Sequence, residues 1–216
     1  MEFEILVGCI SFLFITVTSW VFAVVLFYKF LKKGDKNKLL LALSFFFIGL
    51  GWFGVALALI NPVFSGITKM TNGIFNCIGV MFLCIMFFNF YYPKHIRWAY
   101  ILSIITIIPV TLSLVLMPPE YVNNRVNYTP LHLILFFIPV LIALVCSVFF
   151  IILGFDRKLN SIVRKKSLIF GIGLLIADIA SLLTAVASSM GIFWIHTMFK
   201  IMVASGIIIL AYGSFI

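Results

Sequence analysis

The sequence predicts an all-α polytopic membrane protein: one seven-transmembrane-helix bundle over residues 1–216, with its N-terminus outside and its C-terminus in the cytoplasm. Hydrophobic residues make up 64% of the chain and charged residues only 10%, which is far from the composition of a soluble domain. Seven apolar runs each approach the ~20 residues that a helix needs to cross a bilayer. The loops between these runs alternate in charge, and this alternation predicts the orientation.

The seven runs follow one another with short connections. They cover roughly residues 5–28, 39–60, 67–90, 98–117, 131–154, 167–189 and 193–216. The first run is too long for a signal-peptide core, so we expect it to be retained as a helix. Pro109 and Pro139 lie inside the fourth and fifth runs, where each is expected to kink its helix. The spans use nearly the whole length, which leaves no room for a soluble catalytic module.

Basic residues define the orientation. If the N-terminus is outside, Lys69 and Arg125 fall outside and Lys200 falls within the seventh run. The other twelve of the fifteen Lys and Arg are then cytoplasmic: Lys29, Lys32, Lys33, Lys36, Lys38, Lys94, Arg97, Arg157, Lys158, Arg164, Lys165 and Lys166. Because short loops rich in Lys and Arg stay in the cytoplasm, this bias predicts the N-out topology.

The formal charge of +9 is concentrated in these loops, where the lipid bilayer and the insertion machinery explain it, so we expect no nucleic-acid partner. The third cytoplasmic loop carries five basic residues that either determine topology or form a docking surface for a cytoplasmic or membrane protein: Arg157, Lys158, Arg164, Lys165 and Lys166. We expect a multi-pass protein of the plasma membrane.

Small residues predict how the helices pack. A narrow strip recurs every four residues along the sixth run, and it comprises Gly173, Ala177, Ser181, Ala185 and Ser189. Such a strip lets a neighbouring backbone approach closely, so the sixth helix is expected to be central in the bundle. In the second run, Gly49, Gly51 and Gly54 give a looser version of the same pattern.

Two charged residues lie deep in predicted spans. Asp178 and Lys200 stand at depths of ~16 and ~10 Å from the external ends of the sixth and seventh helices, on adjacent antiparallel elements. Charges at such depths cost about 2.5–3.5 kcal/mol on insertion scales. We expect a buried ion pair that a ligand or proton could disturb; the alternatives are a pair that only fixes helix register and a Lys200 that snorkels alone.

Further polar residues share the outer depth of these two charges. Asn72 and Asn76 are four residues apart and lie on one helix face. The predicted ligand-binding set, which a seven-helix bundle could close around as a cavity open to the outside, is Trp52, Asn72, Asn76, Asp178, Ser181, His196 and Lys200. Hydrogen bonding between helices is the competing interpretation of the asparagines.

No metal or cofactor is expected. His132 and His196 lie near external helix starts but lack Cys, Asp or Glu at ligand spacing, so we interpret them as interfacial histidines. A helix-seven Lys suggests the retinal of microbial rhodopsins, but Lys200 lies too near the outer end and the third helix offers no acidic counter-ion.

The stretch from Phe155 to Ile176, with its basic loop followed by Arg164-Lys-Lys-Ser-Leu-Ile-Phe-Gly-Ile-Gly-Leu-Leu-Ile176, resembles the loop and sixth helix of the seven-helix sensor regions found ahead of histidine kinases. The resemblance covers about a tenth of the chain and implies a receptor bundle that relays an external or membrane-borne cue inward. No kinase, cyclase or coiled-coil output follows Ile216 in this sequence.

We therefore expect a non-enzymatic receptor or sensor-like protein that binds a small ligand or membrane-borne cue and signals to a cytoplasmic partner. A small transporter or channel with Asp178 and Lys200 along its path is the first alternative. A structural subunit of a larger membrane complex is the second. Enzymatic chemistry is not expected, because no nucleophile, base and orienting group can be assembled from these residues.

Overall fold

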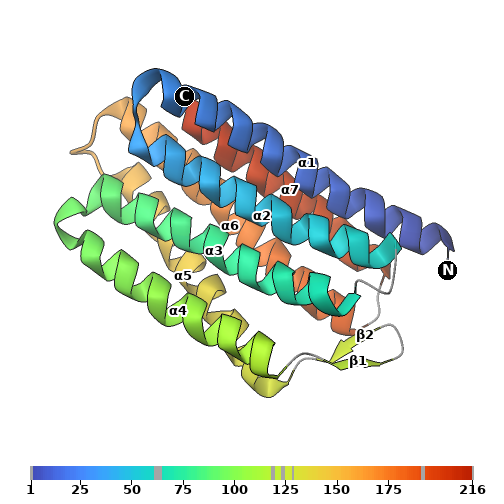
Figure 1. The fold of residues 1–216 in the computed structure, drawn as a ribbon. Helices are drawn as coiled ribbons and strands as arrows, with labels where there is room; N and C mark the ends of the chain where they lie inside the picture. Colours follow the sequence, from blue (N-terminus) through green and yellow to red (C-terminus); the bar gives the residue numbers. More distant parts are fainter. Residues whose placement is uncertain are drawn as a thin grey trace. The chain divides into compact units, whose positions relative to one another are not determined.

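In the computed structural model the described residues are 2–60, 65–117, 120–122, 125–127, 129–190 and 193–215, and side chains are described outside 2–5, 65–70, 120–127, 133, 185–190, 193–194, 196 and 214–215. These residues form seven α-helices and one small sheet (Figure 1). The helices are α1 Glu2–Lys33, α2 Lys36–Ile60, α3 Ser65–Tyr91, α4 Ile96–Leu116, α5 Pro130–Phe155, α6 Ser161–Met190 and α7 Phe193–Phe215, with a 3-10 turn, η2, at Pro93–His95.

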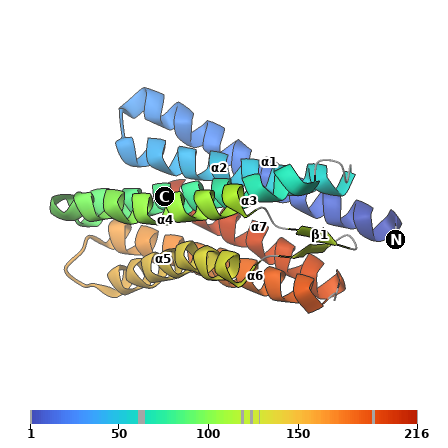
Figure 2. The same ribbon diagram turned by 60° about the horizontal axis from the view of Figure 1, so that its bottom comes forward.

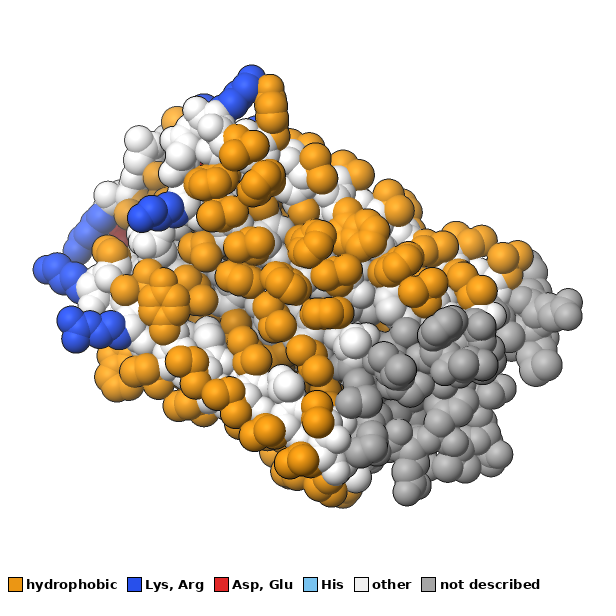
Figure 3. All heavy atoms as spheres, in the orientation of Figure 1, with side chains coloured by type: hydrophobic (Ala, Val, Ile, Leu, Met, Phe, Trp, Pro, Cys, Tyr) orange, Lys and Arg blue, Asp and Glu red, His pale blue; other side chains and the backbone are white. Residues whose placement is uncertain are grey.

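The helices have the length and the surface of membrane spans. Over the described residues, six are long and apolar enough to cross a bilayer, and α7 adds a shorter apolar stretch at Thr197–Gly213. Large hydrophobic side chains are exposed along them, as at Val24 (69%) and Ile134 (64%), and Figure 3 shows hydrophobic side chains spread over much of the face whose side chains it colours. Lipid tolerates this exposure and water does not. The prediction of an all-helical, multi-pass membrane protein is confirmed; the orientation stays a prediction.

The first connection is far shorter than the apolar runs suggested. α1 continues through the lysines to Lys33, and α2 already begins at Lys36. Gly34 ends α1 with a φ of 67°, and its N–H donates to the carbonyl of Phe30 at 2.7 Å. Asp35 caps α2 because its Oδ1 accepts the N–H of Asn37 at 3.0 Å. Lysine favours helix, so these helices extend past their apolar segments.

The helices group into two units, Met1–Pro139 and Val140–Ile216. The division falls within α5 at Pro139, which has no N–H to donate to the preceding turn and therefore interrupts the helix ladder. Each unit is described by itself below. The prediction of a single domain over 1–216 stays a prediction.

In the first unit, α1 to α4 lie side by side in chain order (Figures 1 and 2). Gly49 of α2 faces the ring of Trp20 on α1, where an added Cβ would lie 2.5 Å from the indole. Trp20 Nε1 also donates to the carbonyl of Phe46 at 3.3 Å. α3 and α4 share a buried cluster centred on Cys77, Val110 and Leu114. The glycines of α2 thus allow close packing, as their spacing indicated.

In the second unit, α6 contacts both α5 and α7. Gly206 of α7 faces the backbone of Ala177, where an added Cβ would lie 2.6 Å from the amide nitrogen. Gly171 faces α5, with the Ser147 carbonyl oxygen 2.9 Å from its ideal Cβ position. The rings of Phe150 and Phe170 meet at 4.7 Å between centroids. Within this unit α6 lies between α5 and α7, and the close backbone approach at Ala177 confirms the predicted role of the strip; a central place of α6 in the whole bundle stays a prediction.

A small hairpin stands in the segment that the sequence presented as an ordinary loop. β1, Glu120–Val122, pairs antiparallel with β2, Arg125–Asn127, and Tyr121 lies opposite Val126. Tyr and Val favour strands, and two asparagines, which are common turn residues, separate the pair in the sequence. We did not predict this pairing.

Candidate functional site

Asn72 and Asn76 form an amide pair on α3. Asn76 Nδ2 donates to Asn72 Oδ1 at 2.6 Å, and both residues are half-buried. The pair packs on Gly51 of α2, where an added Cβ would lie 3.0 Å from Asn72 Oδ1. A larger residue at position 51 would push the amides away. The prediction that the two asparagines share one helix face is confirmed. The bond between them does not use Asn72 Nδ2 or Asn76 Oδ1, and these atoms could donate to or accept from a ligand.

Trp52 contacts a different neighbour. Its ring stacks on Phe12 of α1 with 5.4 Å between centroids and 17° between planes. It packs with the buried cluster of Cys9, Phe12 and Ala56. Successive helical residues point about 100° apart, so Gly51 faces α3 while Trp52 faces α1. Trp52 therefore lies on a different face of α2 from the one that contacts the two asparagines, and the place of Trp52 in the ligand-binding set stays a prediction.

Asp178 is the most unusual polar group in the second unit. The residue as a whole is half-buried, but its Oδ2 atom is buried and has no hydrogen-bond partner among the described residues. A buried carboxyl oxygen without a donor is costly, and the cost rises in a membrane span. Ser181, one turn further along α6, donates its hydroxyl to the Ala177 carbonyl at 2.7 Å, within its own helix.

Lys200 is also buried, with 1% of its surface exposed. It lies on the face of α7 that carries Ala204, Ile207 and Ala211, which are all buried as well. A lysine inside a membrane span is a functional-site candidate by default, because its ammonium group requires a polar environment. The burial of Lys200 is thus observed, and its position within a membrane span stays a prediction.

The register of α6 against α7 opposes a direct ion pair between Asp178 and Lys200. Ala177 lies opposite Gly206, so Lys200 is level with a position about five residues beyond Asp178, ~7.5 Å along the axis. Side chains tilt toward the N-terminus of their own helix, which takes these two further apart because the helices are antiparallel. Because Asp178 Oδ2 also lacks a hydrogen-bond partner among the described residues, the geometry favours independent roles for the two groups, and the direct pair stays a prediction.

The predicted set is thus divided. Trp52, Asn72 and Asn76 belong to the first unit, whereas Asp178, Ser181 and Lys200 belong to the second. His196 lies on α7, but its side chain is outside the described residues. A cavity enclosed by the complete set stays a prediction.

His132 has a role that sequence reasoning missed. It is fully buried, with 0% of its surface exposed, rather than interfacial. The Thr129 N–H donates to Nδ1 at 3.2 Å, so Nδ1 is an acceptor and the ring proton lies on Nε2, 3.1 Å from the Ser113 carbonyl. His132 therefore ties the start of α5 to the end of α4. The run Thr129-Pro130, a cap residue before a first-turn proline, was the available signal.

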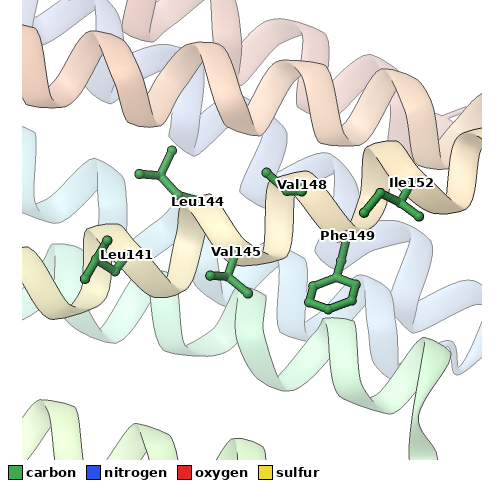
Figure 4. Close-up of a pocket in the computed structure, with 6 residues that line it drawn as sticks. All are labelled: Leu141, Leu144, Val145, Val148, Phe149 and Ile152. Atoms are coloured by element: carbon green, nitrogen blue, oxygen red, sulfur yellow. The ribbon is translucent and has the colours of Figure 1, made fainter.

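The second unit also carries an apolar hollow of about 300 Å³. It is lined by six residues of α5 alone: Leu141, Leu144, Val145, Val148, Phe149 and Ile152 (Figure 4). The lining offers no polar group that could orient a ligand, so the hollow suits an acyl chain or an apolar helix rather than a polar substrate.

Among the described residues, no group of three or more His, Cys, Asp or Glu side chains is placed to hold a metal ion. Comparisons of the chain with family models, curated proteins and solved structures each found no match.

Proposed function

We propose that this chain is a receptor or sensor-like membrane protein that crosses the cell membrane seven times, with its N-terminus outside and its C-terminus in the cytoplasm. The observation that carries the proposal is the buried Oδ2 of Asp178, which has no hydrogen-bond partner in the part of the chain that the structure describes. A buried carboxyl oxygen without a hydrogen-bond partner is stabilised by any ligand that supplies a hydrogen-bond donor or a positive charge. The ligand class is thus a small hydrogen-bond donor or cation, with the proton as its smallest member.

α6 provides a route for the signal. It packs against α7 at the Ala177–Gly206 contact, close to Asp178 in the sequence. At its cytoplasmic start, Arg164 Nε donates to the Gly154 carbonyl of α5 at 3.4 Å. A ligand that changes the packing of α6 would therefore alter the loop that carries Arg157 and Lys158. This loop is the proposed contact for a cytoplasmic or membrane protein partner.

The relay can be tested without knowing the ligand, because Asp178→Asn mimics a carboxyl group whose charge has been neutralised. A spin label at Lys158→Cys reports on the α5–α6 loop, and a label at Lys94→Cys reports on the α3–α4 connection. We expect Asp178→Asn to change the spectrum at 158 and to leave that at 94 unaltered. The matched control is Ile179→Ala, because Ile179 lies on α6 beside Asp178 but is exposed on the apolar surface and outside the predicted ligand-binding set. Identical spectra for Asp178→Asn and wild type with the label at position 158 would contradict the proposed signal route from Asp178 to the α5–α6 loop.

A transporter or channel is the second candidate, and the burial of Lys200 favours it. Asp178 and Lys200 place ionisable groups at two depths of one helix pair, as a stepwise path through the membrane requires. Proteoliposome flux of protons, sodium and chloride separates the candidates. The receptor proposal expects no flux above protein-free liposomes, whereas flux that is lost in Lys200→Met supports transport.

A further inference from the structure

The first unit brings two basic connections together at one end. Asn89, near the end of α3, donates from Nδ2 to Asn37 Oδ1 at the start of α2, at 2.7 Å. This side-chain bond ties the first turn of α2, which follows the α1–α2 turn, to the last turn of α3, which precedes η2. Antiparallel helices alone would place both connections on the same side of the membrane, and the bond brings the start of α2 directly beside the end of α3, so that both connections contribute to the surface at this end of the unit.

This surface is strongly positive. We define the basic end as five exposed residues: Lys32, Lys33, Lys36, Lys94 and Arg97. Asp35 is the acidic residue of the α1–α2 turn, and it already pairs with Lys38 at 3.4 Å while it caps α2. The five cations of the basic end therefore keep most of their charge for a partner.

Aromatic residues place the basic end at the depth of lipid headgroups. Trp98, next to Arg97, is 59% exposed, and Tyr92, next to η2, is 39% exposed. Lys32 lies over the ring of Tyr28, with 4.6 Å between Nζ and the centroid. Trp and Tyr at the ends of apolar helices concentrate at the membrane interface, and Lys side chains extend from the apolar segment toward it.

We propose that the basic end binds the phosphate of an anionic phospholipid headgroup. Clusters of four to eight Lys and Arg beside a span attract anionic lipid, and the attraction grows with each added basic residue. Arg97 adds the fork of donors that matches phosphate geometry. Membrane topology depends on how many Lys and Arg lie in the loops and not on how close the loops are to one another. The Asn37–Asn89 bond brings two basic connections together, and this proximity distinguishes a binding site from charges that only set the topology. This inference is independent of the proposed receptor function.

The test measures lipid binding to the full chain in detergent by native mass spectrometry, with phosphatidylglycerol against phosphatidylcholine. We expect phosphatidylglycerol to bind at least about tenfold more tightly, and the preference to fall as salt increases. The charge variant is Lys36→Gln/Lys94→Gln/Arg97→Gln, which should remove most of the preference. The matched control removes three charges from the α5–α6 loop instead, as Arg157→Gln/Lys158→Gln/Lys165→Gln, and should retain it.

Asn89→Ala provides the sharper variant, because it separates the two connections without changing any charge. We expect it to lower the preference several-fold, whereas an unchanged preference would mean that convergence has no role. Equal binding of the two lipids to wild type, or equal loss in both triple variants, would overturn the site. Glycerol phosphate separates the two sources of phosphate: we expect millimolar concentrations to leave the bound lipid in place, and complete displacement would assign the surface to free phosphate.

Discussion

Asn37 and Asn89, 52 positions apart in the chain, are joined by a hydrogen bond of 2.7 Å between their side-chain amides. The bond fixes the start of α2 beside the end of α3, and so it fixes which basic residues share one side of the first unit. Neither asparagine was conspicuous in the sequence, because each stands alone beside a helix end.

The orientation is the first testable consequence. With the N-terminus outside, cysteines at Lys36 and Lys158 should be protected from an external membrane-impermeant reagent, and a cysteine at Asn123 should react. The background lacks the native Cys9, Cys77, Cys84 and Cys146, which are all buried. Strong external labelling at position 36 with none at 123 would reverse the topology.

His132 should be a major determinant of stability. His132→Ala removes the bonds to Thr129 and Ser113 and leaves a cavity, so we expect the free energy of unfolding to fall by about 2–4 kcal/mol. Thr129→Val removes the hydroxyl group but keeps the backbone N–H that donates to Nδ1, so about 1 kcal/mol is expected. Denaturant unfolding in mixed micelles measures both. Equal losses in the two variants would show that the imidazole is not the essential link.

The α6–α7 contact should be intolerant of side-chain volume. An added Cβ at Gly206 would lie 2.6 Å from the Ala177 nitrogen, and backbone cannot yield as a flexible side chain does. Gly206→Ala should therefore destabilise the protein by about 1–3 kcal/mol. The neighbouring Ser205→Ala is the control, because Ser205 is exposed and bonds only the Ile201 carbonyl of its own helix in the described contacts. Equal melting temperatures for Gly206→Ala and Ser205→Ala would contradict the observed register of α6 against α7.

Asp178 and Lys200 should behave independently in a double-mutant cycle. At an axial offset of ~7.5 Å with diverging side chains, direct coupling is weak. We expect Asp178→Asn and Lys200→Met to be additive in unfolding free energy within about 0.5 kcal/mol. A coupling energy above about 1 kcal/mol would show that Asp178 and Lys200 interact directly.

Periodicity and composition were sufficient for the number and positions of the helices, because crossing a bilayer leaves few alternatives to long apolar helices. They were insufficient for helix ends: α1 runs to Lys33 because Gly34 and not the first lysine terminates it. Shared faces such as that of Asn72 and Asn76 follow from spacing within one helix. The partners of Trp52 and the register of Lys200 depend on how two helices slide against each other, which no single-helix pattern contains.

The most direct test of the proposed receptor site is the reactivity of a cysteine at position 178 in the membrane. Small water-soluble thiol reagents modify ionised thiols that contact water, and a thiol in lipid stays protonated and unreactive. The adjacent Ile179→Cys is the matched control, because Ile179 is 42% exposed on the apolar surface of α6. We predict that Asp178→Cys reacts with reagent added from outside at a rate at least about tenfold above that of Ile179→Cys. Equal, slow reaction at both positions, or reaction at 178 only from the cytoplasmic side, would contradict it.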